Sequence, residues 1–148
     1  MYPTVGGNRA AVIYDDLELF LTDWYRRALT NRPEAVCANV SVGRVESVKT
    51  PPPAKQLVIR DDGTSRDTFL TGRASIGLTV LAGTKLNPRD AKELAQIVLA
   101  LAELIPFDDP SNPLTRVYDS NGPYMVPEDS TFARVYSTVT FGVAARPL

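Results

Sequence analysis

The chain has 148 residues, of which 44% are hydrophobic and 22% are charged, and its formal net charge is −1. This length and composition are typical of one globular domain with enough residues to bury a core. The near-neutral charge and the lack of a basic tail give no indication of nucleic-acid binding.

The sequence contains no histidine and a single cysteine, Cys37. Serine–histidine and cysteine–histidine nucleophiles are therefore excluded, as are histidine-ligated metals and cysteine metal clusters. Carboxylates, lysine and tyrosine remain as acid–base groups, so the commonest catalytic designs are removed. We expect a protein that is not an enzyme and that carries no cofactor or metal.

No secretory signal or membrane span is expected from the sequence. The N-terminal segment lacks a continuous apolar run and soon acquires acidic residues. No stretch approaches the roughly 18 apolar residues of a membrane-spanning helix. We expect a protein of the reducing cytosol, or of a particle assembled there, without membrane association.

The first predicted helix runs from Asp16 to about Thr30. Asp15 is placed to cap it, with Glu18 as the capping-box partner, and Asn31–Pro33 ends it. Trp24 is predicted to anchor the core. Apolar residues at helical spacing form one stripe: Leu17, Phe20, Leu21, Trp24 and Ala28.

The second predicted helix follows Asn87, its expected N-cap, and has Pro88 at the first helical position. Asp90 suits the positive end of the helix, and Pro106 ends it. The apolar face consists of Leu94, Ile97, Val98, Leu101, Leu104 and Ile105.

The remaining segments predict strands, because apolar and polar residues alternate in them. We expect Asp61–Gly63 and Asn121–Pro123 to be turns. Cys37 is expected to be a small filler residue in the first strand. The predicted strands are residues 36–42 with Val36, Val40 and Val42, then Lys55–Arg60, Thr68–Ala82, Leu114–Tyr118 and Phe132–Ala144.

The element order α-β-β-β-α-β-β, with short connections between consecutive strands, favours an antiparallel sheet. Each strand has one apolar face, and both helices are amphipathic. The sequence therefore predicts a single α+β domain over residues 1–148, a two-layer sandwich with a mainly antiparallel sheet and two helices on one face. The other face of the sheet would be open to water or to a partner.

Four segments in a fixed order carry a resemblance to a known family. They are LVIRDDG at Leu57–Gly63, GLTVLAGT at Gly77–Thr84, DSNGPYMVPE at Asp119–Glu128 and ARVY at Ala133–Tyr136, with an Ala/Leu-rich helix between the second and third. In this order the chain resembles the tail terminator proteins of long-tailed (siphovirus-type) phages, particularly those of actinobacterial phages. The resemblance extends from Asp16 to about Ala144.

The resemblance implies a structural virion protein without catalytic residues or cofactor. Such proteins form a homo-hexameric ring at the head-proximal end of the tail tube, where they stop polymerisation of the major tail tube protein. They then offer a docking surface to the head–tail neck proteins, and double-stranded DNA passes through the ring without specific binding. Assembly takes place in the host cytoplasm. Two alternatives are another head–tail adaptor of similar fold and a small-molecule-binding regulatory α+β domain.

The alternation of side chains along the strands predicts a candidate assembly interface. The family resemblance itself implies no particular interface residues. If Leu70, Ile76 and Val80 face the helices, polar side chains of the same strands face outward. The candidate interface residues are Arg60, Arg73, Arg134, Tyr136 and Thr138.

This outward set contains no acid although the whole chain is slightly acidic, whereas a solvated sheet normally mixes both charge signs. We interpret it as contacting the acidic surface of a neighbouring subunit, in preference to DNA in the ring lumen or to plain solvent. The proline-rich segments Arg44–Pro53 and Pro106–Pro113 suit either docking loops or plain connectors.

Overall fold

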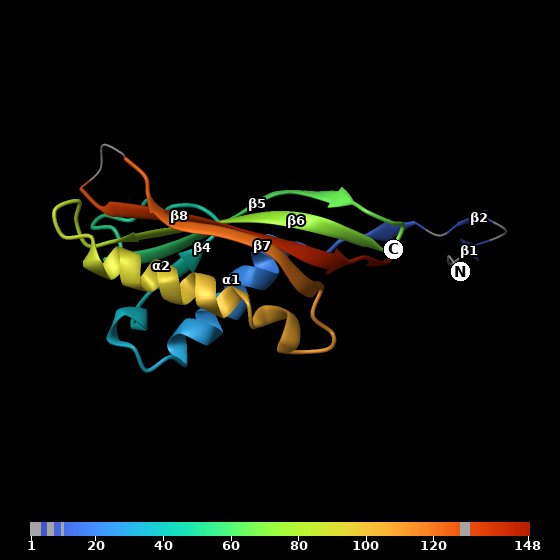
Figure 1. The fold of residues 1–148 in the computed structure, drawn as a ribbon, viewed down its shortest axis with the longest axis horizontal. Coiled ribbons are helices and arrows are strands. Elements are labelled where there is room, and N and C mark those ends of the chain that lie inside the picture. The colour runs from blue at the N-terminus through green and yellow to red at the C-terminus, as the bar shows by residue number, and fades with distance from the viewer. Residues whose placement is uncertain (1–3, 6–7, 10, 128–130) are drawn as a thin grey trace.

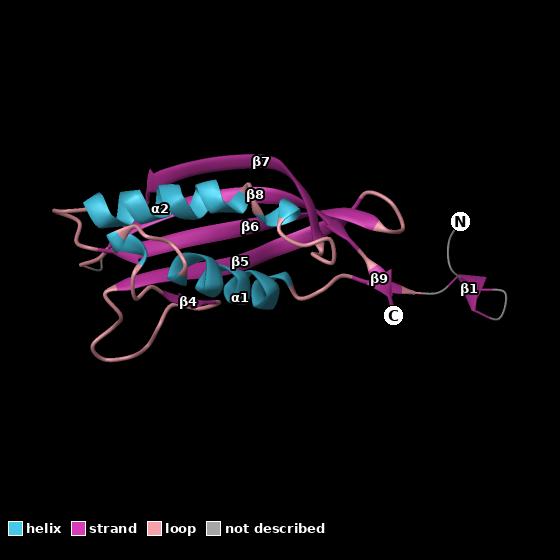
Figure 2. Cartoon of the chain, turned by 90° about the horizontal axis from the view of Figure 1, so that it is seen from below, coloured by secondary structure: helices cyan, strands magenta, loops and turns pink. Residues whose placement is uncertain are grey.

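The computed structural model describes residues 4–5, 8–9, 11–127 and 131–148. A five-stranded sheet in the order β4-β5-β6-β8-β7 carries the helices α1 (Leu17–Thr30) and α2 (Arg89–Ala102) on one face (Figure 1, Figure 2). Only β4 and β5 are parallel, and the other neighbours are antiparallel. The predicted α+β sandwich and its element order are confirmed. The strands are β4 (Ser41–Gly43), β5 (Lys55–Arg66), β6 (Thr71–Ala82), β7 (Leu114–Met125) and β8 (Ala133–Ala144).

Short elements that the sequence did not predict complete the chain. The two-residue strands β1 (Thr4–Val5) and β2 (Asn8–Arg9) pair with each other, and β3 (Val12–Ile13) pairs with β9 (Arg146–Pro147). β1 and β2 lie beyond one end of the sheet (Figure 1). Two 3-10 helices, η1 (Ala35–Cys37) and η2 (Ile105–Phe107), follow α1 and α2 respectively.

The N-terminus of α1 differs from the predicted capping box. Asp16, rather than Asp15, caps the helix by accepting a hydrogen bond of 3.1 Å from the backbone N–H of Leu19. The Glu18 carboxylate accepts the backbone N–H of Asp61 on β5 at 2.8 Å, so it ties the helix to the sheet. A contact distant in the sequence thus replaces the local one.

The second helix begins at Arg89, and Pro88 occupies the N-cap position without a side-chain capping bond. Asn87 is engaged instead with Thr84, whose backbone carbonyl accepts its N–H at 3.1 Å. The predicted Asn87 cap is therefore wrong by one position. Leu104 lies beyond the helix and is 57% exposed, so it does not belong to the buried face.

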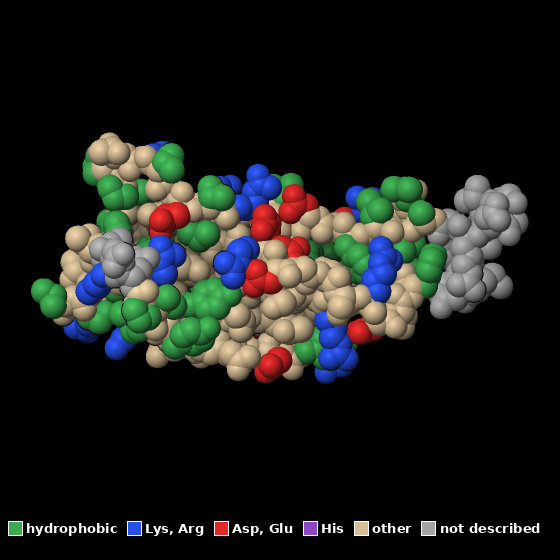
Figure 3. All heavy atoms as spheres, turned by 90° about the horizontal axis from the view of Figure 1, so that it is seen from above, with side chains coloured by type: hydrophobic (Ala, Val, Ile, Leu, Met, Phe, Trp, Pro, Cys, Tyr) green, Lys and Arg blue, Asp and Glu red, His purple; other side chains and the backbone are tan. Residues whose placement is uncertain are grey.

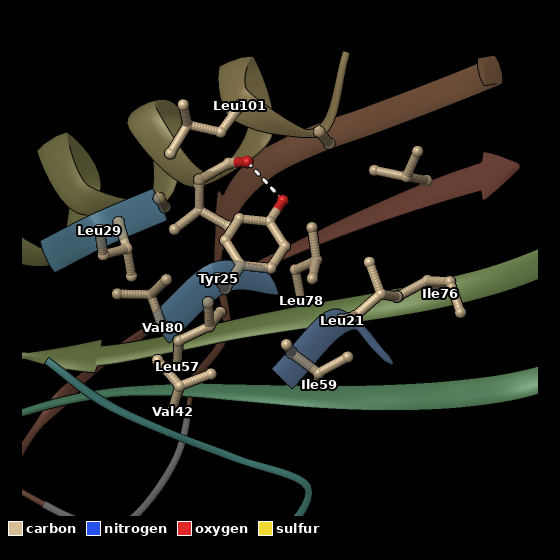
Figure 4. Packing of buried hydrophobic residues seen from close by; sticks show 14 of the residues in the cluster. Leu21, Tyr25, Leu29, Val42, Leu57, Ile59, Ile76, Leu78, Val80 and Leu101 are labelled. Atoms are coloured by element: carbon tan, nitrogen blue, oxygen red, sulfur yellow. Dashed lines mark hydrogen bonds between the residues drawn. The ribbon is translucent and has the colours of Figure 1, made fainter. Parts of the chain in front are cut away.

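The core lies between the two helices and the sheet (Figure 4). Tyr25 is completely buried there, and its hydroxyl donates a 2.7 Å hydrogen bond to the Val98 carbonyl of α2. Trp24 packs edge-on against Tyr25 and is buried as predicted. Figure 4 shows side chains from α1 and from the sheet packed among one another, and the labelled ones include Leu21, Tyr25, Leu29, Leu57, Ile59, Ile76, Leu78 and Val80.

The predicted strand over residues 36–42 is mostly absent. η1 occupies its first part, and only the three residues of β4 pair with β5. Asn39 has φ of 58°, a left-handed conformation that interrupts an extended chain. Cys37 is buried, but in η1 and not in a strand.

The two predicted turns are irregularities inside longer strands. β5 continues through Asp61–Gly63 with a register shift, and β7 continues through Asn121–Pro123 with another. Gly63 and Gly122 have positive φ. Turns and bulges both favour glycine at such a position, so a glycine in the sequence does not distinguish a turn from a bulge. The β5–β6 connection falls at residues 67–70, where Leu70 is exposed rather than facing the helices.

Candidate assembly surface

We define the open face as the side of the sheet away from α1 and α2. The register pairs Ile76 with Val139 on the helix side, and both are buried. Gly77, one residue later on β6, pairs with Arg60 and Thr138 on the opposite side. The predicted parity is therefore correct, and all five predicted residues lie on the open face: Arg60, Arg73, Arg134, Tyr136 and Thr138.

Arg60 and Tyr136 meet in the middle of this face. The Arg60 guanidinium donates to the Tyr136 hydroxyl at 3.2 Å and forms a 2.6 Å ion pair with Asp62. The hydrogen bond and charge of Asp62 raise the pKa of Arg60, with a smaller effect from Tyr136. The Tyr136 ring lies over Gly77, where a Cβ would come within 2.7 Å of its hydroxyl, and Tyr124 packs edge-on against it.

A second cluster surrounds Tyr118, which the sequence analysis did not single out. The Arg73 guanidinium lies 4.0 Å from the centre of its ring, and that of Arg116 lies 4.5 Å away. Both distances are within the range of cation–π attraction. Gly142 makes room for the ring, since a Cβ there would come within 3.0 Å of Tyr118. The register of β7 shifts between Val117 and Asp119. Tyr118 therefore does not follow the regular alternation of inward-facing and outward-facing residues that predicted the other positions.

The interpretation of the open face as free of acids is wrong. Arg73 forms an ion pair with Asp67 at 3.0 Å, and Arg134 forms one with Glu46 at 2.6 Å. Asp62 similarly neutralises Arg60. Figure 3, which views this face, shows both charge signs intermixed on it.

These three acids were missed because none belongs to a regular strand position. Glu46 lies in the β4–β5 loop, Asp62 in the β5 irregularity and Asp67 in the β5–β6 turn. The arginines therefore do not require an acidic neighbour to balance their charge. Contact of the open face with another subunit stays a prediction.

Neither edge of the sheet presents a long regular strand for pairing with a further strand. β7 carries three register shifts, and irregular edge strands resist edge-to-edge pairing. On the other edge, β4 pairs only with Gln56–Val58 of β5, and Glu18 occupies the backbone N–H of Asp61. Contacts between side chains are therefore the better candidates for joining copies of this chain.

Large apolar side chains are exposed near both ends of α2. Leu86 is 99% exposed and lies just before the helix, and Phe107 is 86% exposed and lies just after it. A helix of 14 residues is about 21 Å long, so these are two separate apolar sites. Phe107 belongs to the proline-rich segment Pro106–Pro113, which the sequence analysis named as either a docking loop or a plain connector.

The described residues offer little for metal or small-molecule chemistry. They contain no group of three Cys, Asp or Glu side chains able to hold a metal ion. A hollow of about 470 Å³ between α1 and η1 has Arg26 and Arg32 in its lining. Arg32 is paired with Glu34 at 2.7 Å, and Arg26 donates to the Val42 carbonyl at 2.9 Å, so both cations are engaged within the chain. No helix in the described part of the chain has the length and apolarity to cross a bilayer.

No protein-family model matches the chain, and no curated protein matches it.

Proposed function

We propose that this chain is the subunit of a phage tail terminator, a structural ring that caps the head-proximal end of the tail tube. In this proposal six copies form the ring and stop polymerisation of the tail tube protein. The ring then presents a docking surface to the neck proteins, and DNA passes through it without specific binding.

The observation that carries the proposal is the pair of exposed apolar sites at the two ends of α2, marked by Leu86 and Phe107. A cyclic ring needs a heterologous interface, in which one surface of each copy meets a different surface of the next. Two unlike apolar sites on one chain meet that requirement. Exposed leucine and phenylalanine side chains can serve as the apolar contact points of such an interface.

The register of the sheet supports the proposal further. It places Leu57 beside Val80 and Tyr136 beside Tyr124, so the four resembling segments lie on adjacent strands. Segments far apart in the sequence thus form one continuous region of β5, β6, β7 and β8. Many of these residues are buried, among them Leu57, Ile59 and Val80, so the similarity supports a shared sheet on which the proposed role could be built.

The proposal is tested by measuring tail length in the phage that encodes the chain. When the chain is removed, we expect tubes of uncontrolled length that do not join heads, and its return should restore a single length. Tails of normal length that merely fail to join heads would favour the neck-adaptor alternative. Normal virions would contradict both functions.

A further inference from the structure

Arg116 is an arginine of the open face that no acid in the described part of the chain neutralises. It pairs in register with Gly142, which also pairs with Arg73, so Arg116 and Arg73 lie on the same face of the sheet. The three arginines of this face described above all form ion pairs with acids of the chain. Arg116 is exposed and has no such pair within the described residues. One positive charge of the open face is therefore uncompensated.

The packing around Arg116 holds its side chain in place. The guanidinium lies 4.5 Å from the centre of the Tyr118 ring, and a Cβ added at Gly142 would come within 3.0 Å of the Arg116 Cγ. A side chain that is already restricted in this way loses less conformational entropy when a partner binds. Lys92 on α2 is also exposed, but it has neither an ion pair nor a ring contact within the described residues. Arg116 is thus a preorganised cation, whereas Lys92 is not.

Arg73 brings a second guanidinium to the same ring, at 4.0 Å from its centre. The Arg73 Nε donates to the Asp67 carboxylate at 3.0 Å, so the two guanidiniums share one acid. Like charges held near each other repel, and a further anion beside them would offset this repulsion. A carboxylate is suited to the position, because it can accept two hydrogen bonds from one planar guanidinium.

The other charges of the open face favour a single carboxylate over the phosphates of DNA. A surface that binds DNA presents several free cations to the phosphate backbone. Here Glu46, Asp62 and Asp67 lie beside the remaining arginines and would repel a polyanion. An isolated free arginine next to a tyrosine is instead typical of contacts between proteins.

We propose that Arg116, together with Arg73 and Tyr118, binds an acidic side chain of an adjoining protein that is not a copy of this chain. The inference rests on the proposed function, in which copies join through the ends of α2. Arg116 lies on the side of the sheet away from α2, so it stays accessible to the tail tube or the neck proteins when the copies have joined.

The test measures binding of the full chain to tails isolated from a phage that lacks it, and to heads that carry their neck proteins. We expect Arg116→Glu to raise the concentration for half-maximal binding to one of these particles about tenfold. Arg116→Gln should raise it less and should make binding less sensitive to salt, because it removes the charge without reversing it. Lys92→Glu is the matched control and should bind as the wild type does. Thermal unfolding shows whether each variant folds, and Arg116→Gln carries the test if the charge reversal prevents folding.

Three results would overturn the proposed contact. In the first, Arg116→Glu binds tails and heads as tightly as the wild type. In the second, it weakens only the self-association of the chain in sedimentation, so that the partner is a second copy. In the third, it weakens only the retention of a linear double-stranded DNA fragment at low salt, so that the partner is a phosphate.

Failure of this contact is distinguishable from failure of the proposed function. Tails of controlled length that join heads in a phage carrying Arg116→Glu would leave the function standing and overturn the contact. A chain that binds tails through Arg116, but whose removal leaves tail length unchanged, would support the contact and contradict the terminator role.

Discussion

Two glycines of the open face lie beneath aromatic rings. Gly77 leaves space for Tyr136, and Gly142 leaves space for Tyr118. A glycine in a strand interior normally weakens the strand, unless another group approaches closely. Here the rings cover the glycines and hold the arginines of the face in place.

Gly142→Ala should destabilise the fold by about 1–3 kcal/mol, as overpacking does. Its Cβ would lie 2.7 Å from the Thr115 hydroxyl and 3.0 Å from Tyr118, so several side chains must move together. Gly43→Ala is the matched control, because its closest contact is an ordinary 3.5 Å. Equal denaturant midpoints for the two variants would show that the close packing around Gly142 is unimportant.

Tyr25 gives a prediction about alkaline pH. Burial raises its pKa in the folded chain, whereas the unfolded chain ionises near pH 10. The stabilisation from the neutral phenol is therefore complete below about pH 10 and is lost as the pH rises further, by up to about 1.4 kcal/mol per pH unit.

Tyr25→Phe removes this titration and the hydrogen bond to Val98. We expect it to cost about 0.5–1.5 kcal/mol at pH 8, and to decline less steeply than the wild type when unfolding is measured up to pH 11. Parallel pH profiles for the two proteins would contradict the account of this buried phenol.

At the scale of elements, the helices and the two central strands could be predicted because their periodicity is regular. The alternation in β6 and β8 correctly placed Ile76 and Val139 inside and Arg73 outside. β5 and β7 were predicted too short, because each contains an irregularity whose residues resemble a turn. The ion pair of Arg134 with Glu46 depends on a contact distant in the sequence, which no local pattern contains. Asp62 and Asp67 lie close in sequence to their arginines, but in an irregularity and a turn that strand alternation does not describe.

The end of α2 offers a comparison between two leucines. Leu101 is 8% exposed in the core, whereas Leu104 is 57% exposed beyond the helix. Leu101→Ala should therefore cost about 2–5 kcal/mol of unfolding free energy, and Leu104→Ala less than about 1 kcal/mol. Similar losses, measured by denaturant unfolding, would mean that the packing around this end of α2 differs from the one described.

At the scale of the whole molecule, the sheet presents short or irregular edges and a polar open face whose charges are largely paired, and apolar side chains are exposed near both ends of α2. This distribution favours association of copies end to end over pairing through strands. Under the proposed function, such contacts would leave the open face for the tail tube or the neck proteins. The proposed terminator role depends on this arrangement closing into a ring.

The measurement that tests this claim most directly is the number of copies in the assembled ring, determined by symmetry analysis of electron micrographs of the protein on isolated tails. The account predicts six copies arranged about a six-fold axis at the head-proximal end of the tube. A single copy, twelve copies, or the absence of the chain from that end would contradict it.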